Sequence, residues 1–256
     1  LEWRGVPVGE HARAGALRFL ALGTLAPEPR ADEIARRYLT AALRTAAVTD
    51  RLLAARRYDV AVFHHGIYVP QGPVGEVCRR KAVRVVNWNL AYRDKTVLFS
   101  HGDSYHRTMI AEPETAWAAA PFGPAEEAQL IGYLESRKTG GNDWISFQRG
   151  PGSGDAALAR IGLDPGKPAI GLLTNVMWDA QLHFRANAFA SMVDWIRFTI
   201  AHFAARPELQ LVIRVHPAEV LGSVPSRQRI ADEIARDWPT LPHNIRVVDA
   251  ENPENT

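Results

Sequence analysis

Apolar side chains recur along the chain at two spacings, and their alternation predicts the architecture. From Ala31 to Arg57 they return at the spacing of a helix, and a continuous apolar run follows at residues 59–63. That run ends in His64-His65-Gly66, which is typical of a buried parallel strand that reaches a loop. The start of the chain therefore predicts a helix, a strand and a loop with polar side chains.

The same alternation continues through the first half of the chain. An amphipathic stretch reaches Lys81, and apolar runs at 83–88 and 96–100 predict two more strands. Further helices are expected from Tyr105 and at 121–139. Strands that alternate with helices indicate a parallel sheet covered by helices, with right-handed crossovers.

A second alternation begins after a region rich in turn-forming residues. Glycine, proline, serine and aspartate gather at 139–143 and 149–155, which places a domain boundary there. Beyond it we expect strands at 168–174, 209–215 and 245–248 and helices at 185–205 and 226–236. The fold class is therefore α/β, with two Rossmann-like domains at 1–145 and 146–256. Since three strands are few for a nucleotide-binding half, the second domain is expected to be incomplete, with the chain truncated at its C-terminal end.

Composition removes several classes of protein. The 256 residues carry 30 basic and 28 acidic side chains, a net charge of +2, which predicts no nucleic-acid partner. The single cysteine, Cys78, excludes an internal disulfide framework and a cysteine metal cage, and it fits a reducing compartment. No run approaches the roughly 18 to 20 apolar residues that span a bilayer. A cytoplasmic protein without a transmembrane segment is expected.

Polar residues that follow the strands are the candidates for function. In open parallel sheets, ligands bind beyond the carboxyl ends of the strands, where loops and helix N-termini converge. The side chains at these places are His65, Gly66, Asn87, Asn89, His101 and Asp103 in the first half, and Thr174, Asn175, Arg214 and His216 in the second. We expect these residues to line a shared cleft.

The segment Arg214-x-His216-Pro217-x-Glu219 is the most specific of these patterns. An arginine at a strand end binds phosphate through two hydrogen bonds, and a histidine donates to a phosphate or ribose oxygen. Proline ends the strand and fixes the turn that presents His216. The alternative is a strand-terminal turn whose polar side chains face solvent.

The first half offers an acid and two histidines for proton transfer. His65 and its neighbour His64 lie on opposite faces of an extended chain, so at most one reaches the cleft. His101 stands beside Asp103, which is either a general base for an acceptor hydroxyl or the N-cap of the next helix. The catalytic candidates are Asp103, His65 and His101.

Several well-known motifs are missing from the sequence. No Gly-x-Gly-x-x-Gly follows a strand, and there is no Walker-type Gly-Lys-Ser/Thr loop, His-Glu-x-x-His or Gly-x-Ser-x-Gly. An Asp-x-Asp pair that holds a divalent metal in many sugar transferases is absent as well. These absences argue against dehydrogenases, P-loop NTPases, zinc proteases and serine hydrolases, and they favour a metal-independent phosphate site.

Four segments together resemble bacterial capsule polysaccharide biosynthesis proteins. They are the strand ending in His65-Gly66, the helix start at Gly72-Pro73, the segment 99–103 and Arg214-x-His216-Pro217. The chain resembles more loosely the Kdo transferases, polysialyltransferases and teichoic-acid polymerases of GT-B architecture. The resemblance implies transfer of a sugar from a nucleotide-sugar donor to a glycan hydroxyl, without a cofactor.

The resemblance also implies roles for individual residues. It assigns the nucleotide part of the donor to His216 and Pro217, and we extend this site to Arg214, Glu219, Thr174 and Asn175. Gly66, Asn87 and Asn89 would contact the acceptor. Peripheral association with capsule assembly machinery at the inner face of the membrane stays open. Two rival functions also stay open: a non-hydrolysing nucleotide-sugar 2-epimerase and a non-catalytic glycan-binding domain.

Overall fold

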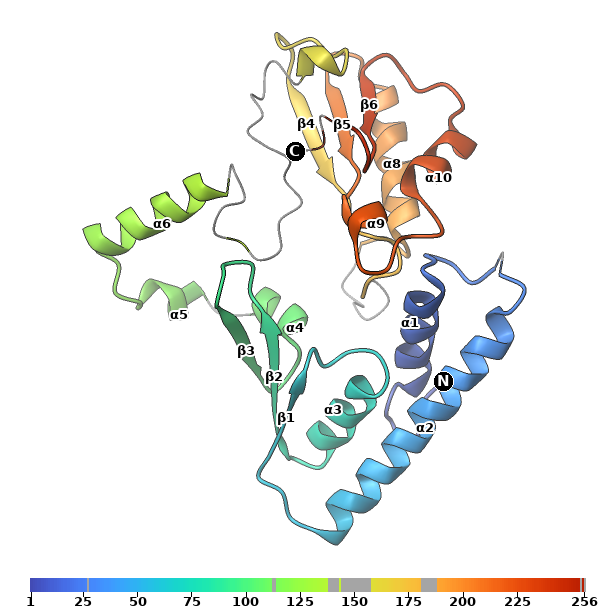
Figure 1. Ribbon diagram of the computed structural model, residues 1–256, viewed down its shortest axis with the longest axis vertical. Coiled ribbons are helices and arrows are strands. Elements are labelled where there is room, and N and C mark those ends of the chain that lie inside the picture. Colours follow the sequence, from blue (N-terminus) through green and yellow to red (C-terminus); the bar gives the residue numbers. More distant parts are fainter. Residues whose placement is uncertain are drawn as a thin grey trace.

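The protein is a mixed α/β structure with two separate sheets (Figure 1). The computed structural model describes residues 1–26, 28–111, 114–137, 143, 158–180, 188–253 and 255. Its helices are α1 (Val8–Leu20), α2 (Ala31–Ala55), α3 (Gln71–Arg80), α4 (Tyr105–Ala111), α5 (Glu114–Ala118), α6 (Pro124–Ser136), α8 (Met192–Ala204), α9 (Ala218–Leu221) and α10 (Ile230–Asp237). Its strands are β1 (Val60–His64), β2 (Arg84–Leu90), β3 (Val97–His101), β4 (Ala169–Leu173), β5 (Gln210–Arg214) and β6 (Ile245–Val248). We call residues 1–137 the first half and residues 158–255 the second half.

The first sheet has the order β1-β2-β3, and its third strand corrects the expected topology. β1 and β2 are parallel, but β3 runs antiparallel to β2, with Asn87 opposite Ser100 and Leu90 opposite Val97. Only six residues separate β2 from β3, which suits a hairpin and is too short for the crossover that a parallel strand needs. The expectation of an all-parallel first sheet was therefore wrong.

Helices cover one face of the first sheet and leave the other open. The covered face, which α3 and α4 contact, buries Val85, Asn87 and Ser100. On the opposite face five large apolar side chains are exposed: Val62, Trp88, Leu90, Val97 and Phe99. This half therefore differs from a sheet with helices on both faces.

The second sheet is parallel and has the order β4-β5-β6. Its apolar face packs against α8 and α10, which lie on the same side of the sheet in Figure 1. Thirteen buried apolar residues form this continuous core, among them Leu211, Ile213 and Ile245. The three strands expected here are confirmed.

The helices of the second half are shorter than expected. α8 begins at Met192 because the Ser191 hydroxyl caps it, accepting from the Asp194 amide at 3.1 Å. The expected helix began at 185, and residues 185–187 lie outside the described residues. α10 begins at Ile230 rather than 226. The expected boundary at 145/146 also falls outside the described residues.

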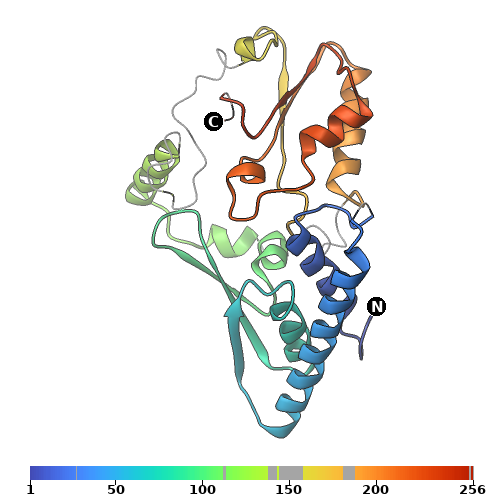
Figure 2. The same cartoon turned by 45° about the vertical axis from the view of Figure 1, so that its right-hand side comes forward.

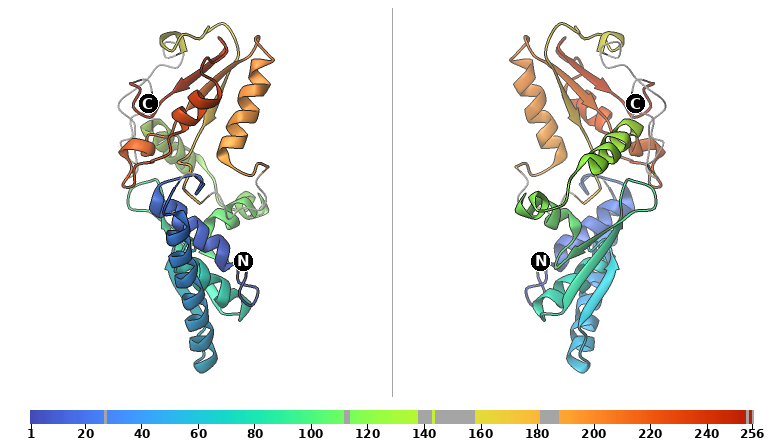
Figure 3. Two further views of the ribbon diagram at one scale, coloured as in Figure 1. Left: turned by 90° about the vertical axis from the view of Figure 1, so that its right-hand side faces the viewer. Right: turned by 90° about the vertical axis from the view of Figure 1, so that its left-hand side faces the viewer.

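The segment that begins with α1 joins the two halves, and the sequence patterns did not predict this helix. The Arg227 amide donates to the Ala21 carbonyl at 3.0 Å, and the Gln228 side-chain oxygen accepts from Gly23 and Thr24 at 2.8 and 3.1 Å. Figure 2 and both views of Figure 3 show the end of α1 next to the second half. Among the described residues, no helix combines the length and apolar content needed to cross a membrane.

Candidate functional site

Asp179 marks the place where polar side chains of the two halves meet. It follows β4 in the second half, and its Oδ1 accepts from the Tyr68 hydroxyl at 2.6 Å. The same hydroxyl accepts from the Ala180 amide at 3.0 Å. The Arg18 guanidinium lies 3.4 Å from Asp179 Oδ1 and 3.4 Å from the Tyr68 oxygen. We call Arg18, Tyr68 and Asp179 the junction triad.

Three further rings of the first half, those of His65, Tyr105 and His106, gather beside Tyr68 of the junction triad. The His65 ring centroid lies 5.6 Å from that of Tyr68, 5.2 Å from that of His106 and 6.5 Å from that of Tyr105. Tyr105 and His106 begin α4, and their ring centroids are 3.9 Å apart. The sheet therefore positions His65 from the end of β1, while α4 supplies two more rings.

The backbone at His65 adopts a conformation that side chains rarely take. Its φ is 69°, and Gly66 follows with a φ of 79°. A left-handed conformation is unfavourable for a residue other than glycine, and such strain is concentrated at functional sites. His64 lies on the open face, with its ring centroid 4.6 Å from that of Trp88 and 5.4 Å from that of His65. The two imidazoles are therefore neighbours, and the charge of His64 is one of the influences that lower the pKa of His65 after burial and His106.

Burial keeps the first-half imidazoles neutral. Burial and the nearby His106 lower the pKa of His65 to about 4, and the Asp179 carboxylate opposes this shift. Burial also lowers the pKa of His106, again against the charge of Asp179. At neutral pH both rings therefore have a nitrogen that is able to accept a proton.

The second half contributes His216 and Arg214 at the end of β5. The Thr174 hydroxyl accepts from the His216 amide at 3.0 Å, and His216 Nδ1 accepts from the Ala218 amide at 3.0 Å. A neutral His216 must therefore carry its proton on Nε2, which makes that nitrogen a donor. Burial and the charge of Arg214 lower the pKa of His216, and Asp179 raises it. Asp179 thus lies within electrostatic range of imidazoles from both halves.

Arg214 is half-buried, and its Nε has no hydrogen-bond partner among the described residues. Its neighbours in sequence, Ile213 and Val215, point into the core, so Arg214 points to the other face of the sheet. The hypothesis of a strand-end cation beside His216 therefore fits the geometry.

The other second-half candidates lie in different surroundings. Glu219 is fully buried, and its Oε1 accepts from the Ile230 amide at 3.1 Å at the start of α10. Burial raises the pKa of Glu219 to about 7. Asn175 is exposed and accepts from its neighbour Val176, while Pro217 is the N-cap of α9. Glu219 thus faces the interior of the second half.

The acceptor candidates form a polar layer under the His65 turn. Asn87 is fully buried, and a Cβ on Gly66 would lie 2.8 Å from its side chain, so glycine is needed there. Asn87 Oδ1, Asn89 Nδ2 and Ser100 Oγ are buried without a hydrogen-bond partner among the described residues. Asn87 and Asn89 therefore support the turn from below, and ordered water is the ordinary partner of such groups.

Asp103 and His101 lie apart from the junction triad. Because β3 is antiparallel, its carboxyl end lies beside Val85 and Val86, away from the carboxyl ends of β1 and β2. Asp103 accepts from the Ser104 amide at 2.7 Å and forms ion pairs with Arg79 at 3.3 Å and Arg107 at 3.2 Å. The assumption that every strand end reaches one edge was wrong for this strand.

Sequence reasoning missed five residues of the site: Arg18, Tyr68, Tyr105, His106 and Asp179. The sequence held a signal for Asp179, because this residue lies in the loop that follows β4, and polar residues in loops at strand ends are the candidates for function. Its neighbour Trp178 is buried and donates to the Ser226 hydroxyl at 3.1 Å, so Trp178 packs under the loop. Arg18 carried no such signal, since it comes from a helix.

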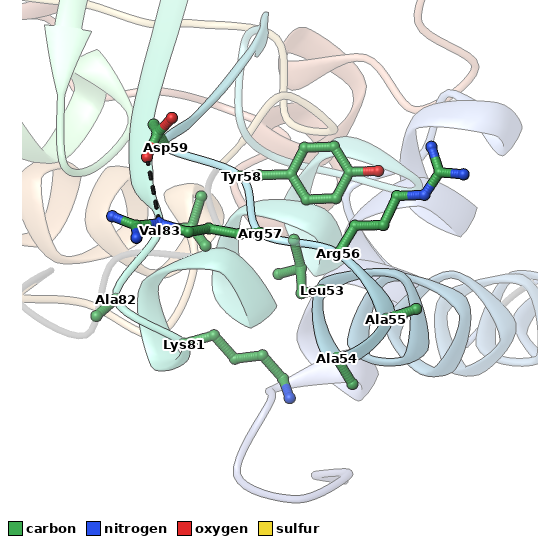
Figure 4. Close-up of a pocket in the computed structure, with 10 residues that line it drawn as sticks. All are labelled: Leu53, Ala54, Ala55, Arg56, Arg57, Tyr58, Asp59, Lys81, Ala82 and Val83. Atoms are coloured by element: carbon green, nitrogen blue, oxygen red, sulfur yellow. Dashed lines mark ion pairs between the residues drawn. The ribbon is translucent and has the colours of Figure 1, made fainter.

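An open hollow lies elsewhere, between the C-terminal ends of α2 and α3 (Figure 4). Its walls include Tyr58, Arg57 and Asp59, and the last two form an exposed ion pair at 3.6 Å. This hollow adjoins the amino-terminal ends of β1 and β2, where an open α/β sheet does not bind its ligand. We therefore take the region around Asp179 as the candidate site.

Comparisons with protein-family models, with curated proteins and with solved structures give no match for this chain. The described residues show a mixed α/β protein with two three-stranded sheets. Within the described residues, no group of three or more histidine, cysteine or acidic side chains is placed to hold a metal ion.

Proposed function

We propose that the protein is a metal-independent glycosyltransferase that moves a sugar from a nucleotide-sugar donor to a glycan hydroxyl. The observation that carries the proposal is that Asp179 of the second half accepts from the Tyr68 hydroxyl and lies 3.4 Å from the Arg18 guanidinium of the first half, beside the His65 ring. The charge of Asp179 also opposes the burial that lowers the pKa of His65, His106 and His216. Polar ends of β1 and β5 therefore meet in one region, as a two-substrate transfer requires.

Each half then has its own task. The Arg214 guanidinium and the Nε2–H of His216 bind the phosphate of the donor and stabilise its charge as the sugar–phosphate bond breaks. The acceptor oxygen forms the new bond to the sugar, and its proton passes to a neutral imidazole of the first half. His65 suits this role better than Asp103, whose carboxylate is engaged by Arg79 and Arg107.

Nucleotide binding tests the proposal most directly. CMP, UDP, GDP and CDP are added separately in a thermal-shift measurement on the wild type, on His216→Ala and on His243→Ala, an exposed control histidine in the second half. At about 100 times its Kd, a nucleotide that binds is expected to raise Tm by roughly 5 °C or more. His216→Ala should lose most of this shift, and His243→Ala should keep it. If none of the four nucleotides raises Tm, the proposal fails.

Product analysis separates the rival functions. A transferase joins the sugar to the acceptor and releases the nucleotide, whereas a 2-epimerase changes the sugar while it stays attached to the nucleotide. A glycan-binding domain binds the acceptor and leaves the donor intact. Cytoplasmic location and a glycan partner belong to this proposal, since they follow from the use of a nucleotide-sugar.

A further inference from the structure

One carboxylate of the second half faces the ionisable groups of the first. Asp179 meets Arg18 from α1 and Tyr68 from the loop after β1, and its charge also reaches His65, Tyr105 and His106. From its own half, His216 lies within range of its charge, beside Arg214. Asp179 is thus surrounded by four imidazoles or phenols and one guanidinium of the first half, and by His216 and Arg214 of its own half.

The contacts of Asp179 are short and directional. Tyr68 donates to its carboxylate at 2.6 Å and is held in turn by the Ala180 amide at 3.0 Å. The Arg18 guanidinium stacks over the rings of Tyr68 and Trp178, 5.0 and 5.1 Å from their centroids. A small apolar cluster of Ala14, Ile67, Tyr68 and Ala180 closes the contact. The position of Tyr68, and through it that of the neighbouring His65 ring, therefore depends on the second half.

We propose that Asp179 is a positioning residue that completes the imidazole base of the first half when the two halves lie together. Its role in catalysis rests on the proposed transferase function, whereas the electrostatic link does not. The carboxylate orients Tyr68 against the His65 ring, and its negative charge stabilises the imidazolium that forms when an acceptor hydroxyl gives up its proton. The proton ends on the imidazole, and Asp179 takes no part in its transfer.

The arrangement gives a physical reason for building one site from two halves. A buried imidazole is a poor proton acceptor, because burial disfavours its charged form. A carboxylate nearby offsets this loss only while it stays close. A base whose carboxylate comes from the other half therefore works when the halves are closed, and it loses proton affinity when they separate.

Histidine titration by NMR tests this link without any substrate. The chemical shifts of the ring protons of the nine histidines are followed against pH in the wild type, Asp179→Asn and Asp103→Asn. Asp179→Asn keeps an oxygen for Tyr68 but removes the charge, so His65, His106 and His216 should all titrate at lower pH than in the wild type. Asp103→Asn should leave the titrations of His65, His106 and His216 in place.

Arg18→Gln gives an independent test with the opposite sign. The charge of Arg18 lowers the pKa of His65, so its removal should move the His65 titration to higher pH. This variant keeps the inference testable even if Asp179→Asn does not fold. If His65 titrates at the same pH in folded Asp179→Asn or folded Arg18→Gln as in the wild type, the inference is overturned. It is also overturned if Asp103→Asn shifts the His65 titration as much as Asp179→Asn does.

The outcomes for the two proposals differ. If the titrations move as stated but no nucleotide binds, the electrostatic link stands and the transferase function fails. If a nucleotide binds but the titrations do not move, the transferase function stands and Asp179 has no role in the base. With an active donor and acceptor, Asp179→Asn should lower kcat and move the acid limb of its pH profile to lower pH, whereas Asp179→Glu should recover part of kcat.

Discussion

The two halves bury their side chains differently, although each is built on three strands. The second half has one continuous apolar core of thirteen residues behind its sheet. In the first half the buried apolar residues form smaller separate clusters among α1, α2 and α3, and one face of the sheet stays exposed. The second half is thus suited to hold Arg214 and His216 rigidly, and stability in the first half depends more on polar contacts.

Buried polar atoms without a hydrogen-bond partner among the described residues occur in both halves, but four of those in the first half lie together. In the second half they are Arg214 Nε, Glu219 Oε2 and Asn255 Oδ1. In the first half His65 Nδ1, Asn87 Oδ1, Asn89 Nδ2 and Ser100 Oγ are buried without a hydrogen-bond partner among the described residues, and they lie at the end of β1 and on β2 and β3. The strained backbone at His65 lies beside them. Unsatisfied polar groups and strain lower stability and are retained where function requires them. The comparison therefore places the proposed proton transfer in the first half, and the proposed phosphate site of Arg214 and His216 on the apolar core of the second.

The largest expected effect is a cavity in the second-half core. Ile213 is fully buried in the middle strand β5. Ile213→Ala removes apolar contacts that α8 and α10 cannot replace, and it should lower the free energy of unfolding by about 2–5 kcal/mol. Urea denaturation followed by circular dichroism measures this change. A loss below about 1 kcal/mol would show that this core is not the rigid support described above.

The second effect is pH-dependent and concerns Glu219, below the His216 turn. Burial raises its pKa to about 7, above the unfolded value, so the folded state holds its proton more tightly. The contribution of protonated Glu219 to the free energy of unfolding is present in full below about pH 4.5, and it is lost as pH rises through about 7. Glu219→Gln should therefore stabilise the protein at pH 8, by up to about 3 kcal/mol, and change little at pH 4.5.

The control for Glu219→Gln is Glu208→Gln, because Glu208 is an exposed acid of the same half. Denaturation at pH 4.5 and pH 8 should show no comparable pH dependence for Glu208→Gln. Equal stability of wild type and Glu219→Gln at pH 8 would mean that Glu219 is accessible to solvent, and it would then return as a candidate for the donor site.

The third effect concerns the polar contacts that hold the first half together. Burial alone raises the pKa of Glu76, but the His11 ring, 3.8 Å from its carboxylate, and the charge of Arg79 outweigh burial and bring the pKa to about 2. Its stabilising contribution is present above about pH 4.5 and is lost as pH falls through 2. Glu76→Gln should therefore lower stability by about 2 kcal/mol at pH 7 and by less at pH 3.

Glu127→Gln on the exposed helix α6 is the matched control and should change stability by less than about 0.5 kcal/mol. Equal effects of the two substitutions would contradict the view that ion pairs support the first half. The measurement is again denaturation at the two pH values.

Sequence patterns predicted the strands well because each strand contains a short apolar segment. β6 was predicted at its observed ends, whereas the direction of β3 was wrong because loop length, which decides it, was not weighed. α1 was missed since it packs through small side chains. The ring of Tyr38 occupies the space beside Gly15, and the ring of His11 occupies the space where Gly72 has no side chain. A pattern based on large apolar residues does not detect such packing.

The residues of the candidate site likewise fall into those that local sequence patterns predicted and those that depend on tertiary contacts. His65, Arg214 and His216 were predicted because each follows a strand, and strand ends are local features of the sequence. Asp179 and Arg18 meet only because the two halves are placed together, 161 residues apart in the chain. Burial of Glu219 was likewise set by α10, eleven residues further on. Contacts of this kind depend on tertiary packing and leave no periodic signal.

The smallest expected effect tests whether the open face of the first sheet stays open. Val62 lies on this face with 58% of its surface exposed, whereas Val85 on the covered face is 1% exposed. Val62→Thr should change the free energy of unfolding by less than about 0.5 kcal/mol, because its hydroxyl remains in water. Val85→Thr buries the same hydroxyl and should cost about 1–3 kcal/mol. A comparable loss for Val62→Thr would show that another surface covers this face in solution.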